Sequence, residues 1–199
     1  MTTWTNNTKN SADPAVAGTS TNTDATSPQT ASNDDSVGTV AWNNPDNIKV
    51  SDNSRAIVDL SSEISNYLTG TNFGFAIPTG STIVGIKAEI EQIRGWSSIE
   101  NSIKIIKGGV ISGDEKSTGA SVPSSDTYVT YGGATDLWGL TWTAEDINLA
   151  TFGVGFSIND GYTVVDHIRI TVYYTTAGTP ATWTNETKSS TTWTNKSSN

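Results

Sequence analysis

The strongest constraint on the fold is a two-residue alternation of apolar and polar side chains that recurs along the chain. In residues 82–94, TIVGIKAEIEQIR, one face carries the side chains of Val84, Ile86, Ala88 and Ile90. Residues 152–158 and 167–174 alternate in the same way. Because successive side chains of a strand point to opposite faces, this period predicts strands with one face buried and the other in solvent.

Shorter apolar segments predict additional strands. They lie at residues 39–42, 55–60, 73–77, 102–106 and 127–131, and turns rich in Gly, Pro and Asn separate them. One helical turn is expected after Thr143, because Asp146 stands at capping-box spacing from it. Many short strands with almost no helix predict an all-β chain, an antiparallel β-sandwich of jelly-roll-like type.

The composition changes twice along the chain, which predicts a compact domain with a polar segment at each end. Residues 2–36 contain no Leu, Ile, Phe or Tyr and are rich in Thr, Asn and Ser. Such a segment cannot by itself bury enough apolar surface to offset its ordering entropy. We therefore expect extended low-complexity arms at residues 1–36 and 176–199, on either side of a sandwich domain at residues 37–175.

The charge and the residue content disfavour several classes of function. The formal net charge is −9, which argues against nucleic acid and against an anionic membrane surface as partners. The chain has no Cys, so disulfides, thiolate zinc sites and thiol nucleophiles are excluded. The first residues, MTTWTNNTKNSADP, do not resemble a secretory signal, and no segment reaches the roughly 18 apolar residues of a membrane span. Assembly in a cytoplasm is expected.

No residue pattern predicts a catalytic site, and the chain is expected not to be an enzyme. Alternation places His167, the single histidine, on the solvent side of a strand, and no nucleophile motif accompanies it. Glu89 and Glu91 share a strand face about 7 Å apart, a separation that also suits a glycosidase pair. Because Lys87 stands beside them, a solvated face of mixed charge is the preferred interpretation.

Two kinds of ligand site stay open. The loops at residues 43–47 and 51–54 are rich in oxygen atoms, so a structural Ca²⁺ is an alternative to Asx-turns, although no EF-hand spacing is present. Turns are preferred, and no metal or cofactor is predicted. Trp96 and Trp138 are candidates for stacking on a ligand such as a sugar ring. The preferred alternative is that the Trp side chains of the domain fill its core, with Trp96 the most exposed of them.

The phrase Thr-Trp-Thr-Asn occurs three times, once near the start of the chain and twice near its end. A Trp is costly in a segment that serves only as a solvated linker, so the recurrence predicts attachment points. Extended Thr-rich segments suit addition to the sheet edge of a neighbouring subunit, with Trp as the anchor in a pocket. The candidate partner-binding residues are Trp4, Asn6, Trp183, Asn185, Trp193 and Asn195.

Several runs, among them GTVAWNNPDN, TDLWGLTWTAEDIN and VDHIRITVYY, resemble a β-sandwich module of tailed-bacteriophage virion structural proteins. The TWTN repeats resemble the arms of such proteins. The resemblance covers residues 37–175 and, separately, the arms, and it brings no catalytic residues with it. It implies a non-enzymatic component of a phage-like particle, with a capsid decoration (cement) protein attached through its arms as the first choice.

Two alternatives stay open. One is a tail or tail-fibre component that acts as a receptor- or carbohydrate-binding module, and the other is a subunit of an extracellular filament. The resemblance implies capsid or tail subunits as partners, together with further copies of the chain in a symmetric oligomer. It also implies a location in the virion after assembly in the host cytoplasm.

Overall fold

The computed structural model describes residues 15–179. The larger compact unit spans Thr19–Ala177 and is all-β, with nine strands in one antiparallel hydrogen-bonded sheet that does not close into a barrel. Residues 1–18 and 178–199 belong to a second unit, in which the described residues contribute an antiparallel bridge between Val16 and Thr179.

The elements of the larger unit are short, apart from two strands. In chain order they are β1 (Ser20–Asn22), β2 (Thr30–Asp34), the 3-10 helix η1 (Pro45–Ile48), β3 (Ala56–Ile64), β4 (Tyr67–Thr71), β5 (Thr82–Arg94), β6 (Ile99–Lys107), β7 (Val110–Ser112), β8 (Thr127–Gly133), α1 (Ala144–Asn148) and β9 (Gly153–Thr175).

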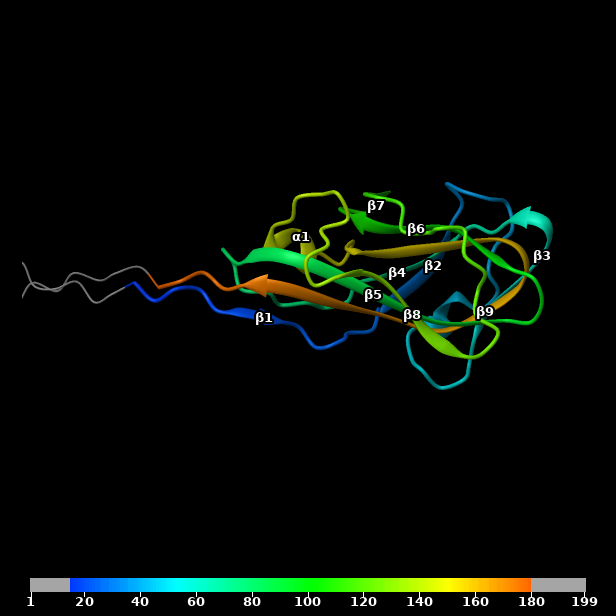
Figure 1. Ribbon diagram of the computed structural model, residues 1–199, viewed down its shortest axis with the longest axis horizontal. Helices are drawn as coiled ribbons and strands as arrows, with labels where there is room; N and C mark the ends of the chain where they lie inside the picture. Colours follow the sequence, from blue (N-terminus) through cyan, green and yellow to red (C-terminus); the bar gives the residue numbers. More distant parts are fainter. Residues whose placement is uncertain (1–14, 180–199) are drawn as a thin grey trace, which may run out of the picture. The chain divides into compact units, whose positions relative to one another are not determined.

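Strand β9 organises the sheet because it folds back on itself. Its first part, residues 153–159, pairs with β4 and β6, whereas residues 161–175 pair with β5 on one side and with β3 and β1 on the other. Figure 1 shows β9 running out in yellow and returning in orange. Asp160 and Gly161 reverse it with φ angles of 58° and 80°. One continuous ladder therefore supplies both layers, which confirms the predicted antiparallel sandwich.

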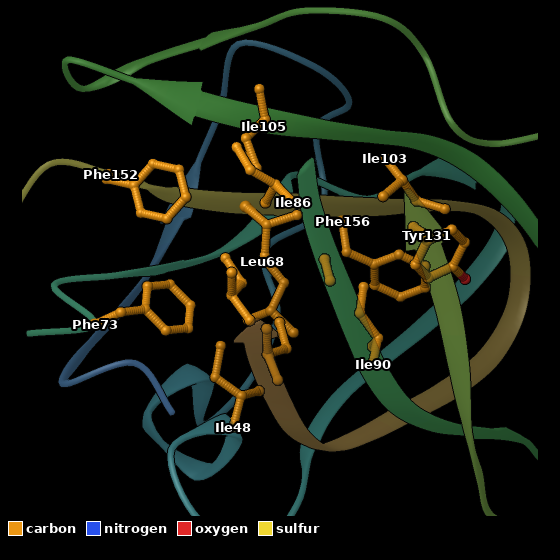
Figure 2. Packing of buried hydrophobic residues seen from close by; sticks show 14 of the residues in the cluster. Ile48, Leu68, Phe73, Ile86, Ile90, Ile103, Ile105, Tyr131, Phe152 and Phe156 are labelled. Carbon is orange, nitrogen blue, oxygen red and sulfur yellow. The ribbon is translucent and has the colours of Figure 1, made fainter. Parts of the chain in front are cut away.

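The core lies between the two layers, where Phe152, just before β9, and Phe156 of β9 meet side chains from β4, β5 and β6 (Figure 2). The inward positions predicted for residues 152–158 are fully buried. So are Ile168, Ile170 and Val172 in the returning part of β9. Each such side chain contributes about 2 kcal/mol of hydrophobic stabilisation, which is the reason the alternation of the sequence determines the layers.

The predicted alternation of residues 82–94 needs one correction, at Val84. This side chain was expected inward, but it is 37% exposed, and its neighbour Ile83 is buried instead. The pairing of β5 with β9 shifts between Ile83 and Gly85, which is a β-bulge. A bulge adds one residue to one strand and so reverses the faces on its far side. Ile86, Ala88 and Ile90, beyond the bulge, are buried as predicted.

The N-terminal boundary of the domain also needs a correction. Residues 1–36 were expected to be an arm, but β1 and β2 lie within this range, and the compact unit begins at Thr19. These polar strands pair with β9 and β4. They add hydroxyl contacts such as Ser32 Oγ to Thr69 Oγ1 at 2.9 Å. A segment poor in apolar residues can thus be ordered by strands that already have a buried face.

Two predicted strands are not strands in the structure. Residues 39–42 contribute only an isolated bridge, from Val40 to Ser65. Residues 73–77 bury Phe73, Phe75 and Ile77 without joining the sheet. The amide side chain of Asn148 takes the place of a partner strand there, because it accepts from the Ile77 N–H and donates to the Ile77 carbonyl, both at 2.9 Å.

The short helix α1 begins as predicted. Thr143 Oγ1 accepts from the Asp146 N–H at 3.1 Å, and the Asp146 carboxylate accepts from the Thr143 N–H at 2.9 Å. This capping box satisfies two N–H groups that a helix start leaves without partners. Ala144 and Ile147 face the core, so the helix closes one edge of the sandwich.

Candidate functional site

The first and last residues of the larger compact unit lie side by side. The Thr19 N–H donates to Thr176 Oγ1, and the Thr176 N–H donates to the Thr19 carbonyl, both at 3.0 Å. Strand β1 continues this pairing along the last residues of β9, with Ser20 opposite Thr175. The chain therefore enters and leaves the sandwich at one place, which we call the terminal end.

The opposite end of the sandwich carries the most exposed large aromatic side chain of the described unit. Strand β5 starts opposite Thr175 and runs 13 residues to Arg94, a length of about 40 Å. Trp96 follows in the loop between β5 and β6 and is 53% exposed, as the sequence predicted. One face of its ring lies against Tyr162 of β9, with the ring centroids 5.1 Å apart and the planes at 35°.

Backbone contacts fix the loop that carries Trp96. The Gly95 N–H donates to the Tyr162 carbonyl at 2.9 Å. On the other side of Trp96, the Ser97 carbonyl lies so close to Gly161 that a Cβ at Gly161 would stand 1.5 Å from it. The indole is thus held by its neighbours in sequence, and its exposed position is not the result of a loose loop.

A third segment completes this end. In β3, Ser61, Ser62 and Glu63 are exposed at a register shift. Ser62 has a φ of 70°, and its N–H donates to Asp160 Oδ1 at 2.9 Å. Ser62 and Asp160 are both non-glycine residues in the left-handed region, a conformation that costs free energy and is common at functional sites. We call the segments 61–63, 95–98 and 159–162 together the Trp96 tip.

The other aromatic candidate has a different environment. Trp138 is fully buried, and its Nε1–H donates to the Ile86 carbonyl at 3.0 Å. Its ring has no face open to a sugar, so it is removed from the candidate ligand-binding residues. Trp42 and Trp142 likewise donate their indole N–H groups to backbone carbonyls, at 3.0 and 2.9 Å. The interpretation that these three rings fill the core and its edge is confirmed.

The single histidine is buried, contrary to the sequence prediction. His167 lies on the outer face of the second layer, as its alternation requires, but the segment before β2 covers it, and only 8% of it is exposed. Its Nε2 shares a hydrogen bond with Ser27 Oγ at 2.8 Å, and its Nδ1 shares one with the Tyr128 hydroxyl at 2.7 Å. Burial lowers the pKa of His167, so the neutral ring is favoured.

Charged groups surround this histidine. Arg169 stacks on the Tyr128 ring at 3.9 Å and holds Glu89 with two hydrogen bonds of 3.1 and 3.2 Å. Burial alone would raise the pKa of Glu89, but hydrogen bonds from Arg169 and Lys87 outweigh burial and lower it. Glu91 stands opposite His167 in the β5–β9 pairing. Glu89 is therefore an ion-pair member, as the mixed-charge interpretation expected, but it is only 8% exposed, so the expectation of a solvated face is wrong at this residue.

The arrangement around His167 contains only part of a nucleophilic site. Ser27 stands where a nucleophile would, but a tyrosine hydroxyl, not a carboxylate, contacts the other ring nitrogen. The hydroxyl–imidazole contact joins residues 140 positions apart, so no local motif could have shown it. The structural effect of this contact is to hold the segment before β2, which contains Ser27, onto the sheet.

A second polar group, which the sequence pattern did not lead us to expect, lies inside the sandwich. Glu100 of β6 is 5% exposed and accepts from the Tyr131 hydroxyl at 2.5 Å, and Gln92 donates to that hydroxyl at 2.8 Å. Burial raises the pKa of Glu100 despite these donors. Burial and the neighbouring carboxylate also raise the pKa of Tyr131 far above its usual value. A signal was available, because Gln92 continues the inward phase of Ile86, Ala88 and Ile90.

The described residues also form a surface depression. A shallow, open depression of about 190 Å³ lies between β2, β4 and the β6–β7 turn, below the roughly 300 Å³ of an ordinary ligand pocket. Within residues 15–179, no group of three or more His, Asp or Glu side chains is arranged to hold a metal ion. In the loop at residues 51–54, Asp52 Oδ1 accepts from the Ser54 N–H at 2.8 Å, as an Asx-turn does. The expectation that the protein needs no metal or cofactor stays a prediction.

The partner-binding candidates of the arms, Trp4, Asn6, Trp183, Asn185, Trp193 and Asn195, lie outside the described residues. Their role stays a prediction. Among the helices that the structure describes, none is long and apolar enough to cross a membrane.

Comparison with known proteins gives a distant likeness. No family model matches the chain, and no curated protein matches it. Among solved structures, the chain is similar to the enzymatically active domain of tailspike protein 4 of bacteriophage CBA120, with a TM-score of 0.33 and 12% sequence identity. The likeness covers 71% of this chain and 19% of that chain.

This likeness contradicts the expectation that the chain is not an enzyme, because the matched domain is described as enzymatically active. The expectation rested on the lack of a local motif. Side chains from distant parts of the chain can meet without such a motif, as Ser27 and His167 do. A likeness of this size assigns neither a reaction nor catalytic residues to this chain.

Proposed function

We propose that the protein is an outward-facing component of a phage-like particle, anchored through both of its arms. The observation that carries this proposal is the pairing of β1 with the end of β9, which brings the two chain ends out of the sandwich together. Both arms contain the TWTN phrase, so the repeated anchors are delivered from a single end of the domain. Attachment at that end leaves the Trp96 tip about 40 Å further out.

Capsid decoration is the placement that we put first. An acidic sandwich with long polar arms suits a clamp over shell subunits, and its net charge of −9 repels nucleic acid and keeps an abundant protein soluble before assembly. Particle sites are symmetric, so a symmetric oligomer is the expected form. A tail or tail-fibre position is the second candidate, and the exposed indole of Trp96 at the far end favours it.

The test is attachment to particles made without the protein. Purified full-length chain is mixed with such particles, and the bound fraction is measured by co-sedimentation. The Trp4→Ala, Trp183→Ala and Trp193→Ala variants, singly and together, are expected to lose attachment progressively. Trp96→Ala is the matched control, because it removes an exposed indole from the opposite end of the sandwich. Full attachment of the triple arm variant would refute the proposal.

A further inference from the structure

The Trp96 tip has the chemistry of a small binding site. One face of the Trp96 ring packs on Tyr162, and the side chain is still 53% exposed. The face that points away from Tyr162 is therefore open to solvent. An exposed indole lacks the hydrophobic stabilisation that a buried one contributes. Since Gly95 and Ser97 are held by β9, the sandwich displays this ring in a fixed position.

The segments that pack beside the Trp96 loop are polar and carry hydrogen-bond acceptors. Ser61, Ser62, Glu63 and Ser97 are exposed, and Asp160 is half-buried. One oxygen of Glu63 accepts from the Ser61 N–H, and one of Asp160 accepts from the Ser62 N–H, at 2.6 and 2.9 Å. A carboxylate has two oxygens and about four acceptor positions, so both groups keep acceptor capacity. The basic residue of this end, Arg94, donates its Nε–H to the Val122 carbonyl.

We propose that the Trp96 tip binds a neutral saccharide, with one sugar ring stacked on the open face of Trp96. Its hydroxyl groups would donate to the acceptors of Asp160, Glu63 and the neighbouring serines. A pyranose ring presents apolar C–H groups on one face and hydroxyls around its rim, which matches an open aromatic face with acceptors on the neighbouring segments. Negatively charged sugars are disfavoured, because the tip carries two carboxylates and the whole chain has a net charge of −9.

A protein partner fits the tip less well. A stable protein interface buries about 1,600 Å² and has a wide apolar centre. The exposed large apolar side chains of this end are Trp96 and Ile99, and Ile99 is only 39% exposed. A single sugar ring requires no more apolar surface than one indole face provides.

The test uses the full-length chain and a panel of four tetrasaccharides, built from glucose, mannose, galactose and N-acetylglucosamine. Binding is followed through the backbone and Trp indole ¹H–¹⁵N signals, the backbone signals of the tip serving for the variants, and the Trp96 indole signal is assigned by its loss in Trp96→Phe. We expect at least one saccharide to shift the Trp96 signal, with a Kd below about 5 mM. Trp96→Ala should weaken binding at least about tenfold, whereas Trp96→Phe, which keeps a ring, should retain most of it.

Tyr173→Ala is the matched control, since it removes a half-exposed aromatic ring near the terminal end. Its affinity should equal that of the wild type. Three results would overturn the proposal: no binding by any of the four saccharides, equal binding by Trp96→Ala, or a self-association that depends on Trp96 in sedimentation velocity. The proposal is independent of particle attachment, because the arm Trp variants should keep saccharide affinity and Trp96→Ala should keep attachment.

Discussion

Replacement of Glu100 by Gln should change how stability depends on pH. Glu100 is 5% exposed, with the Tyr131 hydroxyl at 2.5 Å and Gln92 Nε2 at 3.5 Å from one carboxylate oxygen. Burying an ion costs several kcal/mol. One strong hydrogen bond to a charged group returns about 1.5–3 kcal/mol, and a contact of 3.5 Å returns little. The ionised form is therefore disfavoured in the folded state by on the order of 1–2 kcal/mol.

The pKa of Glu100 is raised by burial, which agrees with this penalty on the ionised form. Its stabilising contribution is fully present below the pKa of the unfolded chain and is lost as the pH rises through the higher folded pKa. Between those two values, the free energy of unfolding falls by up to about 1.4 kcal/mol per pH unit because of this group. Glu100→Gln keeps a carbonyl oxygen for Tyr131 and removes the charge. It should match the wild type or be slightly less stable near pH 4, and be more stable at pH 8.

The assay is urea unfolding followed by Trp fluorescence at several pH values between 4 and 9. The quantity compared is the difference in free energy of unfolding between variant and wild type. Asp146→Asn is a control of opposite sign. Burial alone would raise the pKa of Asp146, but hydrogen bonds from Thr143 and Lys107 outweigh burial and lower it. That variant should therefore lose stability at neutral pH. Parallel pH profiles for wild type and Glu100→Gln would refute the reasoning.

Three other predictions concern single side chains. Burial lowers the pKa of His167 in the folded state, so the unfolded chain takes up a proton at a higher pH than the folded chain does. The free energy of unfolding should therefore fall as the pH drops below about 6.5. His167→Gln should reduce this loss in acid-unfolding curves. Thr143→Ala removes the capping box of α1 and should cost about 1 kcal/mol in urea unfolding, with Thr143→Ser retaining most of the stability. Gly161→Ala places a Cβ 1.5 Å from the Ser97 carbonyl at a φ of 80°, so thermal unfolding should show a loss of about 3 kcal/mol or more, or no folded protein at all. A Tm equal to that of the wild type would contradict this last expectation.

The sequence was sufficient for the strands whose two faces differ. Phe152, Phe156 and Ile168 are buried as predicted, because a period-two pattern and a half-buried strand express the same geometry. It failed at Val84, since a β-bulge reverses the faces and leaves no mark in an alternation that continues on both sides. It failed for a different reason at residues 19–36, where order comes from the partner strands.

The candidate sites were less predictable because they depend on long-range contacts. Trp96 could be singled out from its turn-like context, but its packing on Tyr162 could not. His167 was placed on the correct face of its strand and was still given the wrong exposure, because the residues that cover it lie 140 positions away. The alternation offered one usable and overlooked sign, the polar side chain of Gln92 at a position that points inward.

The path of β9 has a consequence for the order in which the protein can fold. This strand pairs with β1, β3, β4, β5 and β6, and its residues are the last of the sandwich to leave the ribosome. The earlier strands cannot complete either layer until residues 153–175 are available, so most pairings join distant parts of the chain. Such a topology folds slowly, on the scale of milliseconds to seconds or longer. The same step joins Ser20 to Thr175, so the terminal end is formed only when synthesis of the domain is complete.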